Sequence, residues 1–432
     1  MYALSGLSWC ILAYRCTELL FSLLPRGTNE LTDLLTGIRV LDLSTNIAGP
    51  SATMILADMG ADVIQVEHPE KGNPMRAMGP HKGEWGAYFV AINRGKRSLA
   101  LDVAQPEGRD LILRLVKGCD VLVENFVGWK ATELGLDENA VRAVRPDVLY
   151  VSLSAYGSRG PDHEKSGSEA LLQARTGILS VTGGSDHPSL EVGVPLLDMG
   201  SGMWTALGIM AGLFERQRSG QGQKIESSLF QTGVTWMTYP LLYHQFTGQD
   251  PVLHETCHPA FAPYGDFPTA DSRLLIGVST DRLFARLCMA LDHIEWTKDS
   301  RFATNSDRLE NREQLGEEMA SVLKESPTQE WLKRFDEYGV PVSPVQGVGE
   351  LLNDAQLAAL EQLQEINLPN TEEPTVRLPR LPINFSLGPK GIAGPPPQLG
   401  EHGREILTEI GLSDGEMDSL VLRGILRIAP DQ

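Results

Sequence analysis

Cysteine is scarce in this sequence, and the cysteines that are present form no recognisable pattern. The 432 residues contain five, scattered along the chain and odd in number: Cys10, Cys16, Cys119, Cys257 and Cys288. Neither a Cys-x-x-Cys pair nor a Cys/His spacing typical of zinc ligands occurs. The sequence therefore predicts no disulfide framework and no bound metal, and it favours a reducing compartment.

Positive charge is scarce as well. The chain has 37 Lys and Arg against 56 Asp and Glu, which gives a net charge of −19. A nucleic-acid-binding surface needs many cations to displace counterions from phosphates, so this composition excludes nucleic acid as a partner. A few cations gathered in one place would still be enough to bind one polyanionic small molecule.

No apolar run is long enough to cross a membrane. Residues 4–24 are mostly apolar, but Arg15 and Glu18 interrupt them, and a spanning helix needs about 20 apolar residues with few or no charges. We expect no stable membrane insertion. An arginine-bearing start is typical of mitochondrial targeting segments, whereas Glu18 favours an extension without a targeting role. Residues 1–33 are therefore assigned as an N-terminal extension, and the expected location is the mitochondrial matrix or the cytoplasm.

Apolar, β-branched segments alternate with helical patterns after Gly37, and the length suffices for two or three domains. This alternation is typical of right-handed βαβ crossovers and a parallel sheet. The turn Ala48-Gly49-Pro50 differs from the G-x-G-x-x-G fingerprint, so nothing here indicates NAD. The expected elements are strands at 38–43, 62–67, 121–124 and 148–153 and helices at 51–59 and 108–116.

The pattern changes near Tyr239, which divides the chain after the extension into three parts. Residues 34–238 are expected to form a large Rossmann-like α/β domain, and residues 239–345 a smaller α+β domain. Residues 346–432 start as a proline-rich return segment and end in helices that we expect to pack on the large domain. The expected elements of the last two parts are a strand at 274–278 and helices at 281–291, 312–323, 329–338, 404–410 and 414–423.

Asp198 lies between an apolar run and a glycine-rich stretch that has the pattern of a buried helix. A carboxylate at a helix start faces unpaired N–H groups and the positive end of the helix dipole. This favours the ionised form that a nucleophile needs. The simpler interpretation is an N-cap, because aspartate is among the best caps and contributes about 1 kcal/mol. The stretch by itself fits both interpretations.

Residues suited to phosphate binding gather after the second predicted strand and near the end of the strand at 121–124. In open α/β sheets ligands bind at the carboxyl ends of the strands, although a charge cluster is more often a solvated face. The group comprises Lys71, Arg76, Arg94, Lys96, Arg97, Asn125 and Lys130.

Taken together, an ordered series of short segments over residues 35–422 resembles the class III CoA-transferase (CaiB/BaiF) family, and within it the dicarboxylate type, such as succinyl-CoA:glutarate CoA-transferase. The resemblance implies a Rossmann-like CoA-binding domain, a smaller domain and an interlocked homodimer of two ring-like chains. The segments that carry it include 37–43, 48–50, 60–64, 93–98, 123–126, 146–147, 205–212, 220–223, 301–302, 311–312, 339–341 and 399–402.

The resemblance also implies roles for individual residues. The nucleophilic aspartate of the family matches Asp198, which would form an acyl-aspartyl anhydride, and Glu169 is a candidate supporting residue. We expect backbone N–H groups around Gly200 to Gly202 to stabilise the developing oxyanion. The residues expected to contact CoA are Asn46, Ile47, Ala48, Leu101 and Asn125. His68 stands where some relatives carry an arginine that contacts a phosphate of CoA. Arg76, Lys96 or Arg97 is expected to replace that contact.

Three departures from the family pattern bear on function. Racemase-like relatives have Gly-His-Asp where this chain has Gly167-Ser168-Glu169, and serine cannot move an α-proton at neutral pH. Formyl-CoA transferase has a polar glutamine where this chain has Ile47, which suits a larger acyl group. Formyl-CoA transferase also has a tetraglycine lid, which is absent from the corresponding stretch of this chain near His258. His258 itself is either a substrate contact or a structural histidine.

We therefore expect a CoA-transferase that moves CoA from a dicarboxylyl-CoA, such as succinyl-CoA, to another carboxylic acid. The CoA thioester is a substrate, and no cofactor is expected to be bound permanently. An acyl-CoA racemase or isomerase of the same fold is a second hypothesis, although the missing histidine counts against it. A non-catalytic partner subunit of a hetero-dimeric transferase is a third, although such a partner should lack Asp198.

Overall fold

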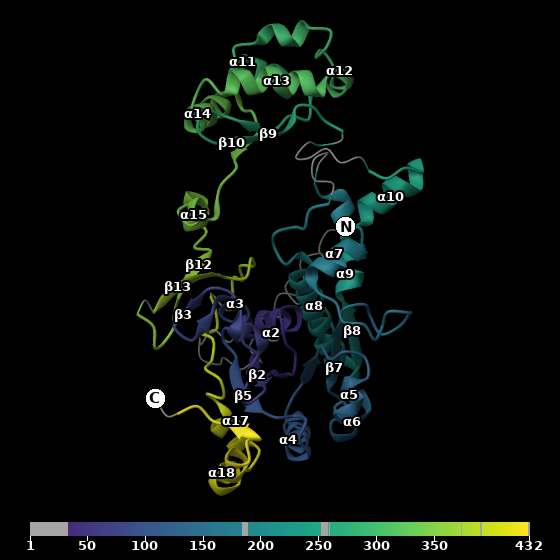
Figure 1. The fold of residues 1–432 in the computed structure, drawn as a ribbon, viewed down its shortest axis with the longest axis vertical. Helices are drawn as coiled ribbons and strands as arrows, with labels where there is room; N and C mark the ends of the chain where they lie inside the picture. Colours follow the sequence, from purple (N-terminus) through teal and green to yellow (C-terminus); the bar gives the residue numbers. More distant parts are fainter. Residues whose placement is uncertain are drawn as a thin grey trace, which may run out of the picture.

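The computed structural model describes residues 33–183, 189–251, 258, 260–372, 374–388 and 391–430. The predictions made for residues 1–32, including a targeting role, lie outside the described residues. Figure 1 shows an elongated molecule with a large lower part and a smaller upper part. Within the described part of the chain, no helix is both long and apolar enough to span a membrane.

A seven-stranded sheet with the order β14-β5-β2-β1-β6-β7-β8 forms the centre of the large part. Every neighbouring pair is parallel except β14 and β5, which are antiparallel. The predicted α/β fold with a parallel sheet is therefore confirmed. The strands are β1 (Arg39–Asp42), β2 (Asp62–Glu67), β5 (Arg97–Leu101), β6 (Val121–Glu124), β7 (Leu149–Ser154), β8 (Lys224–Ser228) and β14 (Leu426–Arg427).

Helices cover both faces of this sheet, because successive side chains of a strand point to opposite faces. Val40 of β1 packs into a cluster with Leu56 and Ile209, from the helices of one face. Its neighbour Leu41 packs into the other cluster, with Ile112 and Ile406. The first face carries α2 (Ala48–Asp58) and α8 (Leu196–Ser219), and the second carries α4 (Pro106–Val116), α6 (Glu138–Val144), α17 (Gly403–Glu409) and α18 (Asp414–Leu422).

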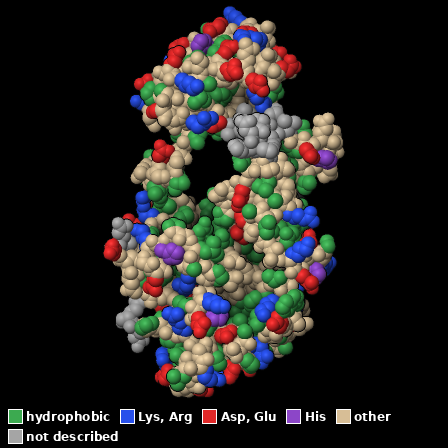
Figure 2. Space-filling model, in the orientation of Figure 1, with side chains coloured by type: hydrophobic (Ala, Val, Ile, Leu, Met, Phe, Trp, Pro, Cys, Tyr) green, Lys and Arg blue, Asp and Glu red, His purple; other side chains and the backbone are tan. Residues whose placement is uncertain are grey.

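The small part has a core of its own, built on the antiparallel sheet β11-β10-β9. Buried side chains from this sheet, such as Leu274 and Ile276, pack against Phe284, Met319 and Phe335 from three helices. The elements are β9 (Tyr264–Pro268), β10 (Arg273–Gly277), β11 (Val342–Pro344), α11 (Asp281–Ala290), α12 (Asn305–Glu310), α13 (Arg312–Leu323) and α14 (Thr328–Tyr338). The space-filling view shows an opening between the two parts of the molecule (Figure 2).

The return segment contains a hairpin that the sequence did not predict. Strands β12 (Leu363–Asn367) and β13 (Thr375–Pro379) pair antiparallel. Val376 and Leu378 pack against a buried cluster that contains Phe89 of α3 (Ala87–Asn93). The shorter connecting elements are β3 (His81–Lys82), β4 (Trp85–Gly86), α5 (Lys130–Glu133), α7 (Glu169–Arg175), α9 (Leu229–Trp236), α10 (Thr238–Thr247), α15 (Val348–Leu351) and α16 (Ala355–Ala359).

Candidate active site

The sheet order places a crevice between β1 and β6. Numbered along the chain, the six parallel strands have the order 3-2-1-4-5-6 of a doubly wound fold, whose direction of winding reverses between strands 1 and 4. Ligands bind at the carboxyl ends of the strands at such a reversal. Here these ends lead into the loop before α2 and into Asn125.

Asn125 joins the two sides of this crevice. Its side-chain oxygen accepts a hydrogen bond from the Thr45 backbone N–H at 3.0 Å, and its Nδ2 donates to the Thr45 carbonyl at 2.8 Å. Asn46, which follows Thr45, is exposed and adopts a left-handed conformation with a φ of 62°. Asn125 therefore fixes the loop that presents Asn46 and Ile47 to solvent.

The first turns of α2 and α8 lie side by side at the same place. A Cβ added to Gly202 would lie 2.0 Å from Ser51 Oγ and 2.9 Å from the Ala48 carbonyl oxygen, so only glycine permits this approach. Leu197 and Ala48 also share one buried cluster. Asp198 is one turn before Gly202, so it lies at the end of α8 that packs against the start of α2.

Glu169, and not Asp198, caps helix α8. The helix begins at Leu196 after Pro195, so Asp198 is its third residue and the predicted N-cap role is wrong. The Glu169 carboxylate accepts hydrogen bonds from the backbone N–H groups of Leu197, at 2.9 and 3.0 Å, and of Asp198, at 2.8 Å. A negative charge at this end of a helix is favourable because it meets the positive end of the dipole.

Burial raises the pKa of Asp198 to about 6, and the neighbouring charge of Glu169 adds to the increase. We expected the helix dipole to favour the ionised form, but Glu169 already occupies the N–H groups that would have stabilised it. The Asp198 carboxylate is therefore more basic than an ordinary aspartate. It is still mostly ionised above neutral pH, which suits a nucleophile.

The predicted oxyanion site at Gly200 to Gly202 is not compatible with the helix. These residues lie in the second turn of α8, where backbone N–H groups bind carbonyls four residues earlier. Only N–H groups of the first turn are free for other partners. An oxyanion would need donors from elsewhere.

Most of the predicted phosphate-binding cations are engaged inside the protein. Arg76 forms an ion pair with Glu67 at 2.7 Å, and its guanidinium lies over the Phe89 ring. Arg97 is paired with Asp62 and Glu409. These arginines therefore neither bind phosphate nor form a solvated charged face. Their charges hold strands and helices of the protein together.

Lys96 is completely buried beneath the crevice. Its ammonium group donates to Asp42, to Gln65, to Asn93 and to the Pro50 carbonyl, at 2.9 to 3.2 Å. Burial lowers its pKa, although Asp42 acts in the opposite direction. In this conformation Lys96 supports the crevice from below and does not reach its surface.

His68 and Lys71 are exposed near the end of β2. His68 accepts hydrogen bonds at Nδ1 from the backbone N–H groups of Glu70 and Lys71, at 3.2 and 3.3 Å. In the part of the chain that the structure describes, the Lys71 side chain has no ion-pair partner. Leu101, in contrast, is 1% exposed within the main core, at the pairing of β5 with β14.

His258 fits the structural interpretation better than the substrate-contact interpretation. Its ring packs against Phe261 and Tyr264, and its Nδ1 accepts a hydrogen bond from the Ala260 backbone N–H at 3.1 Å. The carbonyl of the same residue accepts a hydrogen bond from Arg312. These contacts anchor the start of the small part.

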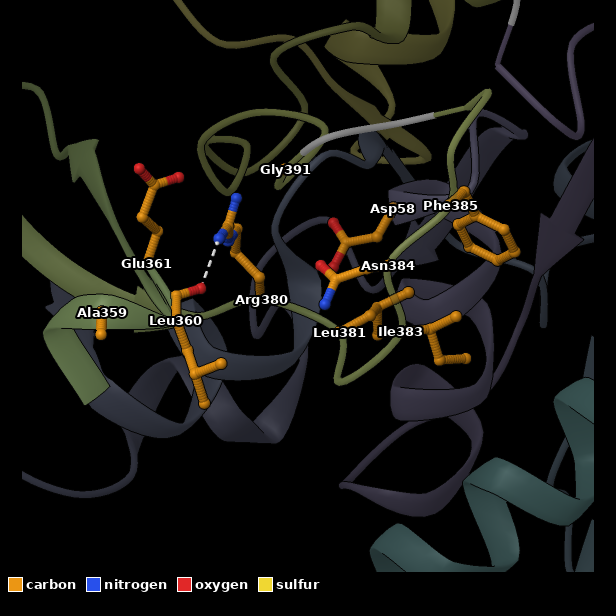
Figure 3. Close-up of a pocket in the computed structure, with 10 residues that line it drawn as sticks. All are labelled: Asp58, Ala359, Leu360, Glu361, Arg380, Leu381, Ile383, Asn384, Phe385 and Gly391. Carbon is orange, nitrogen blue, oxygen red and sulfur yellow. Dashed lines mark hydrogen bonds between the residues drawn. The ribbon is translucent and has the colours of Figure 1, made fainter. Parts of the chain in front are cut away.

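One pocket outside the crevice, of about 390 Å³, lies between the end of α2 and the connection after β13 (Figure 3). Its carboxylate Asp58 is already paired with Arg94 and accepts from the Ala393 N–H. Arg380 donates to the Leu360 carbonyl. Two of the charged groups in the lining, Asp58 and Arg380, are therefore already engaged by other groups of the protein.

Another pocket, of about 450 Å³, lies along β7 and β8 next to the end of β6, and its lining carries more carboxylates than cations. Burial raises the pKa of its Glu124. An excess of negative charge disfavours the pyrophosphate of a CoA molecule. This pocket is consequently not the site for the phosphate groups.

Comparison with known proteins agrees with the arrangement of these elements. The model of CoA-transferase family III matches residues 35–403. Succinyl-CoA:glutarate CoA-transferase of Mus musculus is 32% identical over 93% of this chain and 92% of its own length. Succinyl-CoA–D-citramalate CoA-transferase of Chloroflexus aurantiacus is 32% identical over 90% of this chain and 97% of its own.

A solved structure shows the same fold. The crystal structure of a CaiB/BaiF family protein from Brucella suis superimposes with a TM-score of 0.81 at 33% identity, over 88% of this chain and all of that one. The resemblance drawn from the sequence segments is thereby confirmed over most of the chain.

Proposed function

Because this chain belongs to CoA-transferase family III, we propose that it transfers CoA from a dicarboxylyl-CoA, such as succinyl-CoA, to another carboxylic acid, with Asp198 as the covalent nucleophile. The observation that carries the proposal is the position of Asp198 in the first turn of α8, which packs on the start of α2 next to the crevice, together with its raised pKa. Its relatives, which are named for succinyl-CoA as a donor, support the dicarboxylyl substrate.

The proposed reaction exchanges CoA between two acids without hydrolysis. An Asp198 oxygen attacks the thioester carbonyl, the C–S bond breaks, and CoA leaves as the thiolate while an acyl-aspartyl anhydride forms. The thiolate then attacks the aspartyl carbonyl and releases the donor acid. The acceptor carboxylate attacks this aspartyl thioester and releases the thiolate again, which finally takes the acceptor acyl group from the new anhydride and frees Asp198.

Each intermediate of this sequence keeps the group-transfer energy of the thioester, so the reaction needs neither ATP nor a permanently bound cofactor. Dividing one transfer into several steps is the usual advantage of covalent catalysis. Water must be kept away from the anhydride. The partial burial of Asp198 contributes to this protection.

Glu169 has a supporting role in this proposal. It holds the start of α8 through the N–H groups of Leu197 and Asp198, and its charge makes Asp198 more basic. The exposed Lys71, with His68 beside it, is the proposed contact for the CoA phosphates. The other cations of the group are paired, four of them internally (Arg76, Arg94, Lys96 and Arg97) and Lys130 with Glu133 at the surface.

We also propose that the chain is a homodimer. Large apolar side chains are exposed along α8, α9 and α10, a surface that a soluble monomer would rarely leave open. Figure 2 shows apolar side chains gathered in the middle of the face drawn there. The exposed set includes Met203, Trp204, Leu207, Phe214, Trp236, Tyr239, Leu241, Leu242 and Phe246.

The two alternative functions have less support. A racemase needs a group that removes an α-proton, and Ser168 at the start of α7 cannot do so at neutral pH. A non-catalytic partner subunit has no need of a basic carboxylate beside the crevice. Neither alternative is favoured by a specific observation.

A trapping experiment tests the proposal directly. The protein is incubated with succinyl-CoA and hydroxylamine, and the modified residue is identified by peptide mass spectrometry. We expect a hydroxamate at Asp198, none in Asp198→Asn, and a normal adduct in the matched surface variant Asp110→Asn, whose aspartate pairs with Arg109 on α4. A panel of acceptor acids, assayed in parallel for CoA transfer, defines the second substrate. Transfer without any adduct at Asp198 would contradict the mechanism.

A further inference from the structure

A buried glutamine connects Glu169 to the segment that leads into α8. Gln173, one turn after Glu169 on α7, is fully buried. Its Nε2 donates to Glu169 Oε1 at 2.7 Å, and its Oε1 accepts from the Val192 backbone N–H at 3.0 Å. The Glu169 oxygen that it contacts also accepts from Leu197. One side chain thus joins α7, the cap of α8 and the segment before α8.

The chemistry of this position calls for an amide. At neutral pH, only a side chain with both a donor and an acceptor can bind a carboxylate at one end and a backbone N–H at the other. An apolar side chain of the same length would leave the half-buried Val192 N–H without its partner. An ionised glutamate would repel Glu169.

We propose that Gln173 is a positioning residue of the transfer reaction, because it holds Glu169 against the N–H groups of Leu197 and Asp198 and thereby fixes the direction in which Asp198 presents its carboxylate. This inference rests on the proposed function. Gln173 does not touch the reacting atoms and acts through Glu169. In its absence Glu169 is free to rotate away from α8, and the first turn of the helix loses the carboxylate that caps it.

The geometry also supports a charge effect. Glu169 in its present position adds to the raised pKa of Asp198. When Glu169 moves away, this contribution decreases and Asp198 becomes less basic. A residue with a purely structural role would change stability without changing the basicity of Asp198.

Gln173→Glu gives a test that depends on pH. Above about pH 8 two carboxylates face each other and Glu169 is displaced, so kcat should fall about 10- to 100-fold, as expected for a misplaced reacting group. As the pH falls, repulsion between the two carboxylates favours uptake of one proton by the pair. The protonated carboxyl group introduced by this substitution can then donate to Glu169 and still accept from Val192, as the amide does.

The measured quantity is the ratio of variant to wild-type kcat with succinyl-CoA at each pH, which removes every pH effect that the two proteins share. We expect the ratio to rise several-fold as the pH falls, with KM for succinyl-CoA changed by no more than about twofold. Gln364→Glu is the matched control: Gln364 is a half-buried glutamine of β12 whose oxygen accepts the Ile392 N–H, and its ratio should not vary with pH. A ratio for Gln173→Glu that is independent of pH would overturn the proposal.

A second variant and a second readout keep the test independent of catalysis. The pH midpoint of carbodiimide labelling at Asp198, followed by peptide mass spectrometry, should move down from about 6 in Gln173→Met. An unchanged labelling midpoint together with wild-type kcat would overturn the inference. Failure of both variants to fold would also overturn it, because Gln173 would then have a purely structural role. If the wild type transfers CoA to no acid, the proposed function fails, while the labelling midpoint still decides the role of Gln173.

Discussion

Replacing Asp198 with asparagine should abolish CoA transfer and at the same time make the protein more stable above neutral pH. The folded-state pKa of Asp198 is about 6, against 3.8 for an ordinary aspartate. A carboxyl group whose pKa is raised by folding binds protons more tightly in the folded state. Its stabilising contribution is complete below about pH 4 and is lost as the pH rises through about 6.

The size of the effect follows from the same two values. The difference between about 6 and 3.8 is about 2.2 pKa units, and each unit corresponds to about 1.4 kcal/mol. Ionised Asp198 therefore costs the wild-type fold up to about 3 kcal/mol above about pH 7. Asparagine has nearly the same shape and no charge, so it removes this cost, together with the repulsion from Glu169.

Urea unfolding at about pH 4.5 and about pH 8 provides the measurement. The variant should be more stable than the wild type by about 1 kcal/mol at the lower pH and by about 3 kcal/mol at the higher pH. Activity should fall at least about 10³-fold, as for other essential nucleophiles. Asp110→Asn, at the surface of α4, should show neither change. Equal stability of wild type and variant at both values of pH would refute the assignment of a buried, destabilised carboxylate, and substantial residual activity would refute the nucleophile.

Four further outcomes are expected. The kcat of the wild type should fall as the pH decreases through about 6, with the slope of a single proton, because protonated Asp198 cannot attack a thioester; a profile that is flat down to about pH 5 would contradict this. Glu169→Gln should move that acid limb to lower pH, because a negative charge beside Asp198 is lost, and it should slow turnover while the hydroxamate at Asp198 remains detectable. Lys96→Met should lower the free energy of unfolding by about 3 to 5 kcal/mol in urea titrations, because Asp42 is left buried without its partner; a near-neutral result would mean that water replaces the ammonium group. Light scattering should show a dimer without a monomer peak at nanomolar concentration, whereas a monomer would show that the apolar surface of α8 to α10 has another occupant.

Local sequence patterns predicted the sheet well because its strands are buried on both faces. Such strands are short, continuous apolar runs, and the strands at 62–67 and 121–124 begin and end where they were expected. The helix at 312–323 was also placed correctly, because its apolar residues recur with helical spacing. The hairpin β12–β13 was missed, since its strands lie in a proline-rich segment and are stabilised by pairing with each other and by packing on a cluster distant in the sequence.

Local patterns failed at the cations near the crevice. A row of lysines and arginines has the same appearance whether it binds phosphate or pairs with carboxylates of the same chain. The partners of Arg97 and Arg76 include residues more than 300 positions away, namely Glu409 and the Pro397 carbonyl. No spacing along the sequence could have indicated these contacts.

The alternation of strands and helices, and with it the parallel sheet, follows from the amino-acid sequence alone, because burial of apolar residues at fixed periods is a local property of the chain. The sequence also singled out Asp198 through its resemblance to a family of enzymes. Only the tertiary structure decided the electrostatic state of that residue. Glu169 is 29 positions from Asp198, and its carboxylate takes the N–H groups that Asp198 was expected to use. Burial then makes Asp198 more basic instead of more acidic, because charge and solvation depend on neighbours in space and not on neighbours in sequence.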